Sequence, residues 1–363
     1  MKYSLCVIAQ FPPPIHGLSK AVDTLCNSKM ISEYNVHKID ITDNKMFLRN
    51  VVSIIRDKSE LFYFTISQTK SGNIRDLIIL KLIELKKKKV IIHLHGGYYR
   101  KMLDNDLGPR QKRLNHSALK KVAGAIVLGE SLKYIFKGLM DPKKIHCVQN
   151  CVDDQATISD AKFQKKVKYI GRKATLNILY LSNFIETKGY RNVLEIARIL
   201  NSRHIYKFKF YFAGKFYTKD DEEFFFNFIK ENDLTNLVEY QGIVSGKSKS
   251  ELLKLSDIFI LLTRYKQEGQ PISIIEAMGN GMSIITTDYA GIPDLVSDNI
   301  NGFLVPYNDY DKIITDLLTL YDTRKTHTQF ITSNRKRVNE QFKEKHYLLN
   351  MNNVFNEVLS SEG

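Results

Sequence analysis

The chain has 363 residues, of which 43% are hydrophobic, and this size predicts two domains, each with its own core. Its net charge of +15 is concentrated in residues 1–175, where 32 Lys and Arg stand against 15 Asp and Glu; the remainder holds 22 against 24. Such a basic half is typical of proteins that bind nucleic acid, an anionic membrane surface or an acidic substrate. No base-stacking motif or zinc module accompanies it, so we rank the membrane first and expect no nucleic acid.

Near the N-terminus, the only apolar run in the first fifteen residues is Leu5 to Ala9, which is too short for a signal peptide core or a membrane span. We therefore expect a cytoplasmic protein, either soluble or peripheral on the inner face of the plasma membrane. The four cysteines do not form a disulfide framework in a chain of this length, and we expect reduced thiols and no zinc site.

Short apolar runs rich in Val, Ile and Tyr alternate with segments of helical period along the whole chain. This order predicts an α/β protein with parallel sheets. The predicted strands of the first half are 3–9, 61–66, 90–94, 125–128 and 145–149, and those of the second half are 177–182, 207–213, 238–241, 258–262, 283–286 and 302–305.

The domain limits follow from the same pattern. We expect an N-terminal Rossmann-like domain over 1–153, a polar and basic linker over 154–175 and a C-terminal Rossmann-like domain over 176–343. The segment 344–363 is expected to hold a separate amphipathic helix, Tyr347 to Leu359, that can cross back to the first domain. The two domains are predicted to be doubly wound and to face each other across a cleft, where ligands bind beyond the carboxyl ends of the strands.

In the first domain, two strand ends carry candidate groups. The first strand runs into a proline-rich loop that ends at Gly17, whose backbone can approach a ligand closely, although an ordinary turn explains it equally well. The strand from Val90 ends in His93-Leu94-His95-Gly96-Gly97. Alternation sends His93 and His95 to one face, and the glycines that follow favour exposure of His95 to a ligand.

The second domain carries the most informative motif, which runs from Glu268 to Glu276. Glu268 lies in a Gly-Pro loop, and Pro271 opens an apolar segment typical of a helix that would carry Glu276. With a helical rise of about 1.5 Å per residue, the two acids would lie roughly 12 Å apart. Free amides at the helix start favour a phosphate between them.

Three other strand ends of this domain could add ligand contacts. After its first strand come Asn183 and Lys188, and a lysine at the start of the following helix can reach phosphates. Gly242-Ile243-Val244 and Ala290-Gly291-Ile292-Pro293-Asp294 follow two further strands and could offer backbone groups to a base, although each alone is compatible with an ordinary loop.

Taken in order, these motifs resemble the retaining glycosyltransferases of family 4, the group 1 glycosyltransferases, which have the two-domain GT-B fold. The resemblance rests on Gly17, the His95-Gly96-Gly97 strand end, Gln149-Asn150-Cys151-Val152-Asp153, Ser182-Asn183 with Lys188-Gly189, Gly214 and the motif from Glu268 to Glu276.

The resemblance implies that the domain over 1–153 lies on the acceptor side and that the domain over 176–343 binds the nucleotide sugar. It also implies a role for each position. Glu276 would bind the ribose hydroxyls of the donor, Glu268 the donor sugar and Lys188 the diphosphate, with His95 beside the transferred sugar. The other donor-binding positions implied or considered are Gly17, Asn183, Gly242, Val244, Arg264, Gly269, Gln270, Pro271 and Ile272. Many family members have arginine where this chain has Asn183, so either Lys188 acts alone on the diphosphate or Arg264 assists it. No metal or other cofactor is implied.

One helix of the basic half has two interpretations. Arg110, Lys112, Arg113, Lys120 and Lys121 surround Leu114, Ala118 and Val122, which share one face at a spacing of four. This pattern predicts either a basic amphipathic helix on a membrane or an ordinary surface helix whose apolar face packs on its own sheet.

The function predicted from the sequence is transfer of a sugar, with retention, from a nucleotide diphosphate sugar, expected to be UDP-linked. The expected acceptor is a glycan on a polyprenyl pyrophosphate, in the biosynthesis of a bacterial capsule, O-antigen or exopolysaccharide. Two alternatives stay open: a GT-B enzyme that makes a soluble glycoside or disaccharide, and a non-catalytic protein that binds nucleic acid or another polyanion.

Overall fold

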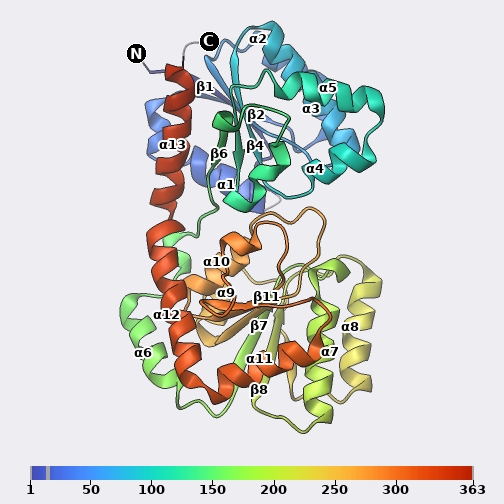
Figure 1. Cartoon of the computed structure of the whole chain (residues 1–363), viewed down its shortest axis with the longest axis vertical. Helices are drawn as coiled ribbons and strands as arrows, with labels where there is room; N and C mark the ends of the chain where they lie inside the picture. The colour runs from blue at the N-terminus through green and yellow to red at the C-terminus, as the bar shows by residue number, and fades with distance from the viewer. Residues whose placement is uncertain (1, 14–16, 362–363) are drawn as a thin grey trace. The chain divides into compact units, whose positions relative to one another are not determined.

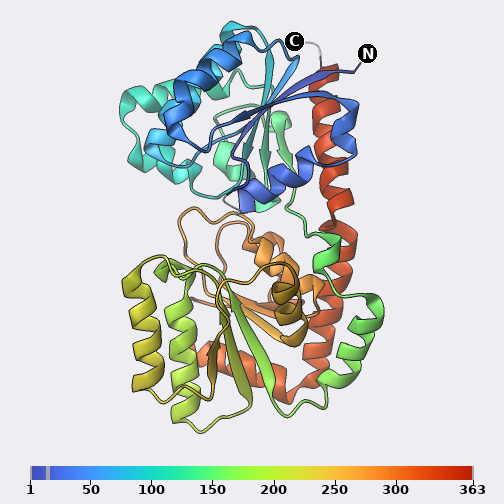
Figure 2. The same ribbon diagram turned by 180° about the vertical axis from the view of Figure 1, so that it is seen from behind.

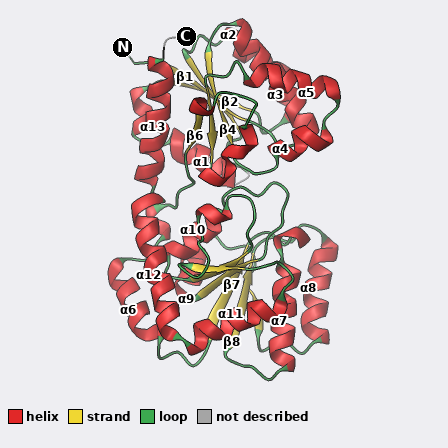
Figure 3. Cartoon of the chain, in the orientation of Figure 1, coloured by secondary structure: helices red, strands yellow, loops and turns green. Residues whose placement is uncertain are grey.

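The computed structural model describes residues 2–13 and 17–361. The chain divides into two compact units (Figure 1), the first formed by Met1–Cys151 with Glu344–Gly363 and the second by Val152–Lys343. Each unit contains a six-stranded sheet in which every pairing between neighbouring strands is parallel (Figure 3). The predicted α/β class with two doubly wound domains is confirmed, and all the predicted strands are present.

The sheet of the first unit has the strand order β2-β1-β3-β4-β5-β6. Its strands are β1 (Ser4–Ala9), β2 (Asn35–Asp40), β3 (Leu61–Thr65), β4 (Lys89–Leu94), β5 (Gly124–Val127) and β6 (Ile145–Cys147). Its helices are α1 (Gly17–Cys26), α2 (Phe47–Arg56), α3 (Lys70–Leu85), α4 (Tyr99–Lys101), α5 (Pro109–Leu119) and α13 (Glu344–Ser360).

Two helical layers cover the two faces of this sheet, as Figures 1 and 2 show from opposite sides. One buried cluster joins Ile8, Phe62 and Ile92 to side chains of α2, α3 and α5. The other joins the alternate strand residues, such as Val7 and Tyr63, to side chains of α1 and α13. This division follows from the period of two along a strand, which sends successive side chains to opposite faces.

The predictions did not include β2, which is an edge strand. It pairs with β1 alone, and of its six residues only Ile39 is buried. Because one face and one edge are exposed, its sequence Asn-Val-His-Lys-Ile-Asp contains no apolar run that would mark it as a strand.

The sheet of the second unit has the strand order β12-β11-β10-β7-β8-β9. Its strands are β7 (Leu176–Leu181), β8 (Phe208–Ala213), β9 (Val238–Tyr240), β10 (Ile258–Leu261), β11 (Ser283–Thr286) and β12 (Gly302–Leu304). Its helices are α6 (Asp160–Ile170), α7 (Tyr190–Ser202), α8 (Lys219–Glu231), α9 (Gly246–Leu255), α10 (Ile272–Gly279), α11 (Tyr310–Asp322) and α12 (Arg324–Gln341).

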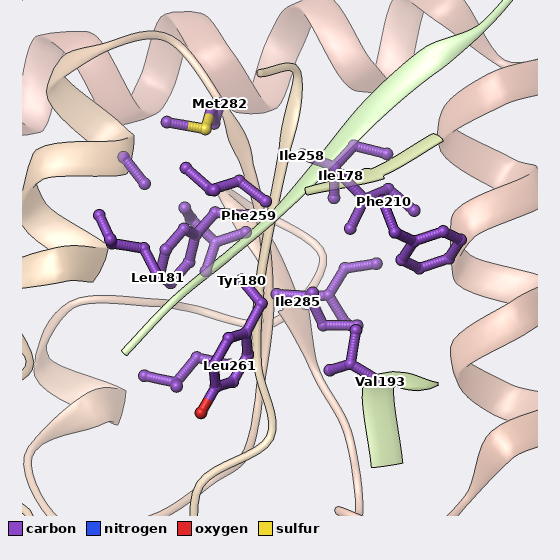
Figure 4. Packing of buried hydrophobic residues seen from close by; sticks show 14 of the residues in the cluster. Ile178, Tyr180, Leu181, Val193, Phe210, Ile258, Phe259, Leu261, Met282 and Ile285 are labelled. Atoms are coloured by element: carbon purple, nitrogen blue, oxygen red, sulfur yellow. The ribbon is translucent and has the colours of Figure 1, made fainter. Parts of the chain in front are cut away.

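A single large cluster forms the core of this unit. Figure 4 shows side chains of β7, β8, β10 and β11 gathered around the sheet, with Val193 of α7 among them. Tyr180 and Phe259 are fully buried in this cluster. The core fixes the central strands, and therefore the loops that leave their carboxyl ends.

The segment 154–175 is not a linker. Most of it is α6, which packs on the second unit through Phe163 and Ile170. Lys166 extends to the main-chain oxygens of Ser256 and Asn280, and burial lowers its pKa to about 8. The lysine-rich composition suggested a solvated linker, but the long stems of such side chains can lie against a core.

The predicted face of α5 marked by Leu114, Ala118 and Val122 packs only in part, because Ala118 is partly buried against the core and Val122 is buried, whereas Leu114 is not. Leu114 is 58% exposed, whereas the helix is buried through Asn115 and Leu119. Asn115 exchanges hydrogen bonds of 2.9 Å with Asn73 of α3. Val122 is buried but lies beyond the end of the helix. Because Asn115 occupies the buried side of the helix and pairs with Asn73, Leu114 is exposed. The spacing of the apolar residues alone could not indicate this arrangement.

The chain passes between the units at Cys151–Val152 and at Lys343–Glu344. Val152 bridges Lys343, and its N–H donates to the carbonyl of Phe342 at 2.9 Å. Cys151 stands where the family that the sequence resembles usually has glycine. It has no positive φ, so the cysteine causes no backbone strain there.

Candidate functional site

The candidate site of the second unit lies at the point where its strand order reverses. From β7 the chain continues to β8 and β9 on one side, whereas β10, β11 and β12 lie on the other. Ligands of such sheets bind beyond the carboxyl ends of the strands at this reversal. The loops after β7 and β10 supply Lys188 and Glu268.

A close backbone contact joins these two loops. Gly189 has a φ of 85°, and a Cβ placed on it would lie 2.3 Å from the carbonyl oxygen of Leu262. The N–H of Arg264 donates to the carbonyl of Thr187 at 2.8 Å. Only glycine tolerates both this conformation and this approach, so the sequence Lys188-Gly189 sets the position of the lysine relative to the loop after β10.

Lys188 and Glu268 form an ion pair. The lysine Nζ lies 2.6 Å from Glu268 Oε2, and the hydroxyl of Thr263 donates to the same oxygen at 3.0 Å. Glu268 is only 6% exposed, and the ammonium also lies 4.6 Å from the centre of the Tyr265 ring. A diphosphate bound at this place would compete with the Glu268 carboxylate for the ammonium group of Lys188, which is already in position.

Helix α10 begins beside this pair. Pro271 is the N-cap residue of α10, and its side chain makes no capping hydrogen bond with the first turn. Gln270 is almost fully buried. The carbonyl of Gly269 accepts a hydrogen bond from the N–H of Gly291, which holds the loop after β11 against the loop that precedes the helix. The amides of the first turn of α10 therefore follow a loop that this hydrogen bond holds in place.

Glu276 lies on α10 and is 1% exposed. Its Oε2 is 2.6 Å from Nζ of Lys249, which belongs to α9. Sequence reasoning missed Lys249, because a lysine in the run Gly246-Lys247-Ser248-Lys249 is typical of a solvated helix start. Only its contact with Glu276 of α10 distinguishes Lys249 from Lys247, whose side chain is 91% exposed.

The remaining predicted donor contacts lie along the same strand ends. Asn183 follows β7 and is exposed, next to Phe184, whose N–H donates to the carbonyl of Lys215. Gly242 accepts a hydrogen bond from the N–H of Gly214, and Val244 packs at the margin of the core. These contacts bring together the loops that follow β7, β8 and β9.

Arg264 points its guanidinium elsewhere in this structure. The group lies 4.4 Å from the centre of the Tyr307 ring and 3.6 Å from a carboxylate oxygen of Glu186. Lys188 is instead paired with Glu268, so the two cations have different partners.

In the first unit, His95 follows β4. Its ring stacks on that of His93, with centroids 3.9 Å apart, as the alternation predicted. His93 is fully buried, and its Nδ1 lies 2.7 Å from the Tyr63 hydroxyl. Burial holds the pKa of His93 well below its usual range, so a neutral ring supports His95. Gly17 begins α1, whereas residues 14–16 of its loop lie outside the described residues.

Comparison with known proteins shows which family and which proteins the chain is similar to. Residues 162–337 match the model of the glycosyl transferases group 1 family. The chain is 27% identical over 172 residues to an amylovoran biosynthesis glycosyltransferase of Erwinia amylovora, which covers 46% of this chain and 41% of that protein. It is 36% identical over 73 residues, 20% of this chain and 18% of that protein, to an Escherichia coli UDP-Gal:alpha-D-GlcNAc-diphosphoundecaprenol alpha-1,3-galactosyltransferase. The chain thus spans less than half the length of either relative.

The fold matches solved structures over nearly the whole chain. The crystal structure of Anabaena HepE in complex with UDP has a TM-score of 0.74, is 14% identical and covers 98% of this chain and 100% of that one. The pair of doubly wound sheets is therefore the GT-B fold, as the sequence resemblance predicted.

Proposed function

We propose that this protein is a glycosyltransferase that transfers a sugar from a UDP-linked donor to a glycan acceptor, with retention of the anomeric configuration. The group 1 domain and the relatives named as glycosyltransferases support a transferase enzyme. The single observation that carries the proposal is the grouping of Lys188, Glu268 and the start of α10 at the strand reversal of the second unit.

In the proposed complex, each group has one task. Lys188 leaves Glu268 and binds the diphosphate, together with amides of the first turn of α10. Glu268 then accepts hydrogen bonds from hydroxyls of the donor sugar, and Glu276 accepts those of the ribose. UDP as the carrier is supported by its presence in the HepE complex, although that likeness concerns the fold alone.

The proposed reaction breaks the bond between the anomeric carbon and the diphosphate oxygen, and the electron pair leaves with the diphosphate. The acceptor hydroxyl oxygen forms its bond on the same side of the sugar, and its proton passes to the departing diphosphate. Lys188 and the helix amides stabilise the charge that develops on that leaving group. His95 is assigned to the neighbourhood of the transferred sugar, in keeping with the family resemblance.

We further propose that the acceptor is a glycan on a polyprenyl pyrophosphate, used in a bacterial surface polysaccharide. Two relatives support this class: one is named for amylovoran biosynthesis and the other for a diphosphoundecaprenol acceptor. The basic first unit, with 27 Lys and Arg against 15 Asp and Glu, favours an anionic acceptor over a neutral soluble one.

The test uses the purified full chain and calorimetric binding of UDP and GDP, followed by a panel of nucleotide sugars scored for release of the nucleotide. Glu276→Gln keeps the shape of the side chain and removes its charge, and we expect it to weaken UDP binding by about 10-fold to 100-fold. Lys247→Gln, on the surface of α9, is the matched control.

Release should increase when a polyprenyl-pyrophosphate-linked glycan is added. If the wild-type chain binds neither nucleotide and releases none from any sugar, the proposed activity is wrong. If release occurs but responds only to soluble acceptors, the donor assignment stands and the acceptor class is wrong.

A further inference from the structure

The outer layer of the first unit carries an unusual number of exposed aliphatic side chains. Of the eleven exposed Leu, Ile and Val residues in the described part of the chain, seven lie on α2, α3 and α5. These helices already bury their inner sides against one face of the sheet. The outer side chains therefore do not serve the core of this unit.

Six of them form two stripes with helical spacing. Leu48, Val52 and Ile55 on α2 are 78%, 45% and 52% exposed, at spacings of four and three residues. Ile74, Ile78 and Leu85 on α3 are 52%, 41% and 67% exposed, and Lys81 occupies the intervening position of that stripe. We call these six residues the α2–α3 face.

The two stripes run side by side. At one end, the guanidinium of Arg75 on α3 donates to the carbonyl of Ile41, which lies in the segment between β2 and α2. At the other end, Nζ of Lys86 donates to the carbonyl of Ile55 at 2.6 Å. Figures 1 and 2 show α2 and α3 as neighbours in the same layer. Scattered exposed side chains are ordinary, but a continuous two-helix face marks an interaction surface.

The charge around this face is strongly positive. Residues 44–88 contain ten Lys and Arg against four Asp and Glu. Two of those acids are buried and already paired, Asp57 with His37 and Asp76 with Arg75. A third acid, Glu84, pairs with Lys81 and with Lys121. The stretch 44–88 still carries six more cations than acids beside the apolar stripes.

We propose that the α2–α3 face docks on an anionic lipid membrane. Its aliphatic side chains enter the boundary between headgroups and acyl chains, and the surrounding cations contact lipid phosphates. No described helix has both the length and the apolar composition to cross a bilayer, so the contact lies on the surface of the membrane. This docking goes beyond the proposed reaction and does not depend on it.

Other occupants fit this surface less well. A second copy of the chain would bring two positive faces together, which costs free energy. A nucleic acid would pair its phosphates with the cations but would leave the six aliphatic side chains uncovered, because stacking on bases uses aromatic side chains. An anionic bilayer offers acyl chains to the six aliphatic side chains and lipid phosphates to the surrounding cations.

The test measures cosedimentation of the full chain with vesicles of phosphatidylcholine alone and of phosphatidylcholine mixed with phosphatidylglycerol. We expect binding to the anionic vesicles only, reduced by added salt. Leu48→Ser combined with Ile78→Ser should weaken it by about tenfold or more, because each lost aliphatic side chain removes on the order of a tenfold contribution. Both residues are exposed, so the fold should persist, which circular dichroism checks.

Two matched controls test the location. Leu349→Ser changes a leucine that is 56% exposed on α13, and Lys345→Gln changes an exposed cation of the same helix; both should bind as the wild type does. Arg49→Gln with Lys81→Gln should weaken binding on the proposed face.

The proposal is overturned if the wild type ignores anionic vesicles, if the double serine variant binds normally, or if Leu349→Ser loses as much. Self-association of the lipid-free wild type that the double serine variant abolishes would also overturn it, in favour of a second copy as the occupant. Because no nucleotide sugar is used, these outcomes are separate from those of the enzymatic proposal.

Discussion

The carboxylate of Glu276 is almost completely buried, and burying such a group without a polar or cationic partner costs free energy. Lys249 supplies one at 2.6 Å. If Glu276 binds ribose hydroxyls, Lys249 acts through it by holding the carboxylate in place. It is therefore a positioning residue, and nothing in the motif from Glu268 to Glu276 indicated it.

We expect Lys249→Met to weaken UDP binding by about tenfold, since a charge-assisted contact to Glu276 contributes roughly 1.5–3 kcal/mol, only part of which reaches the ligand. Lys249→Arg should restore part of the affinity. The measurement is calorimetric binding of UDP and of its 2′,3′-dideoxy analogue. The variant should lose little affinity for the analogue, and equal losses for both nucleotides would contradict a role through Glu276.

Gly189 is the second residue for which the structure makes a sharp prediction. Gly189→Ala places a Cβ 2.3 Å from the carbonyl oxygen of Leu262 at a φ of 85°. We expect a loss of roughly 1–3 kcal/mol in stability and weaker UDP binding, because Lys188 shifts with the loop. Gly171→Ala is the control, since nothing lies within 4 Å of its Cβ. Urea unfolding followed by circular dichroism measures the first effect.

At this scale the sequence predicted Lys188, Glu268 and Glu276 as candidates because they stand in one recognisable order. It could not predict that Lys188 and Glu268 contact each other, or that Lys249 meets Glu276, because these pairs join residues from different loops and helices. Ala290, whose φ is 51°, was also missed as a strained position, since alanine carries no signal for that conformation.

Among the elements, α13 shows that the spacing of apolar residues predicts where a helix lies but not what it packs against. Its apolar spacing predicted a helix over Tyr347 to Leu359, and the structure has α13 over Glu344–Ser360. The partners of that helix depend on tertiary packing. Phe355 is fully buried there, 5.9 Å from Tyr34 and from Tyr63 between ring centroids.

We therefore expect Phe355→Ala to destabilise the first unit by about 3–5 kcal/mol, the usual cost of removing a buried aromatic ring. Because Tyr63 bonds to His93, and His93 stacks on His95, the variant should also disturb His95. Hydrogen exchange of peptides from β3 and β4 reports both effects. Leu349→Ala on the same helix should leave exchange unchanged, and equal effects of the two variants would refute this account.

The elements that were mispredicted share one cause. The polar edge strand β2 and the lysine-rich helix α6 lack the apolar pattern that marks buried elements, because each has few buried residues. On α5, one of the two buried positions is Asn115, which a hydrophobicity pattern assigns to the outside. Periodicity detects an element by its apolar side, and these three pack with little apolar surface.

At the scale of the whole molecule, the observed boundary between the two units changes how much of the net charge each domain is found to carry. Because α6 belongs to the second unit, that unit holds 27 Lys and Arg against 24 Asp and Glu, and the strong excess is confined to the first. The proposed membrane contact accordingly involves the first unit alone.

The stability of the second unit should depend on pH through His327. Burial lowers the pKa of this histidine to about 4, from an ordinary value of 6.5. The unfolded chain therefore binds the proton more readily than the folded chain, so the stabilisation is complete above pH 6.5 and is lost as the pH falls towards 4. Over that window we expect a loss of roughly 2–3 kcal/mol.

Urea-dependent hydrogen exchange of peptides from α12, at neutral pH and near pH 4.5, measures this loss. His327→Gln should reduce the difference between the two conditions, whereas His116→Gln on the exposed side of α5 should not. An unchanged pH response in the His327 variant would show that another group is responsible.

The position of α13 after the second unit in the chain has a consequence for synthesis on the ribosome. About 190 residues separate Cys151 from Glu344, and translating them takes on the order of 10–40 s at roughly 5–20 residues per second. Throughout that time, the face of the first sheet around Val7 and Tyr63 lacks the helix that later covers it. The first unit is thus completed only after the second unit has been synthesised, and we expect its apolar face to stay uncovered until then.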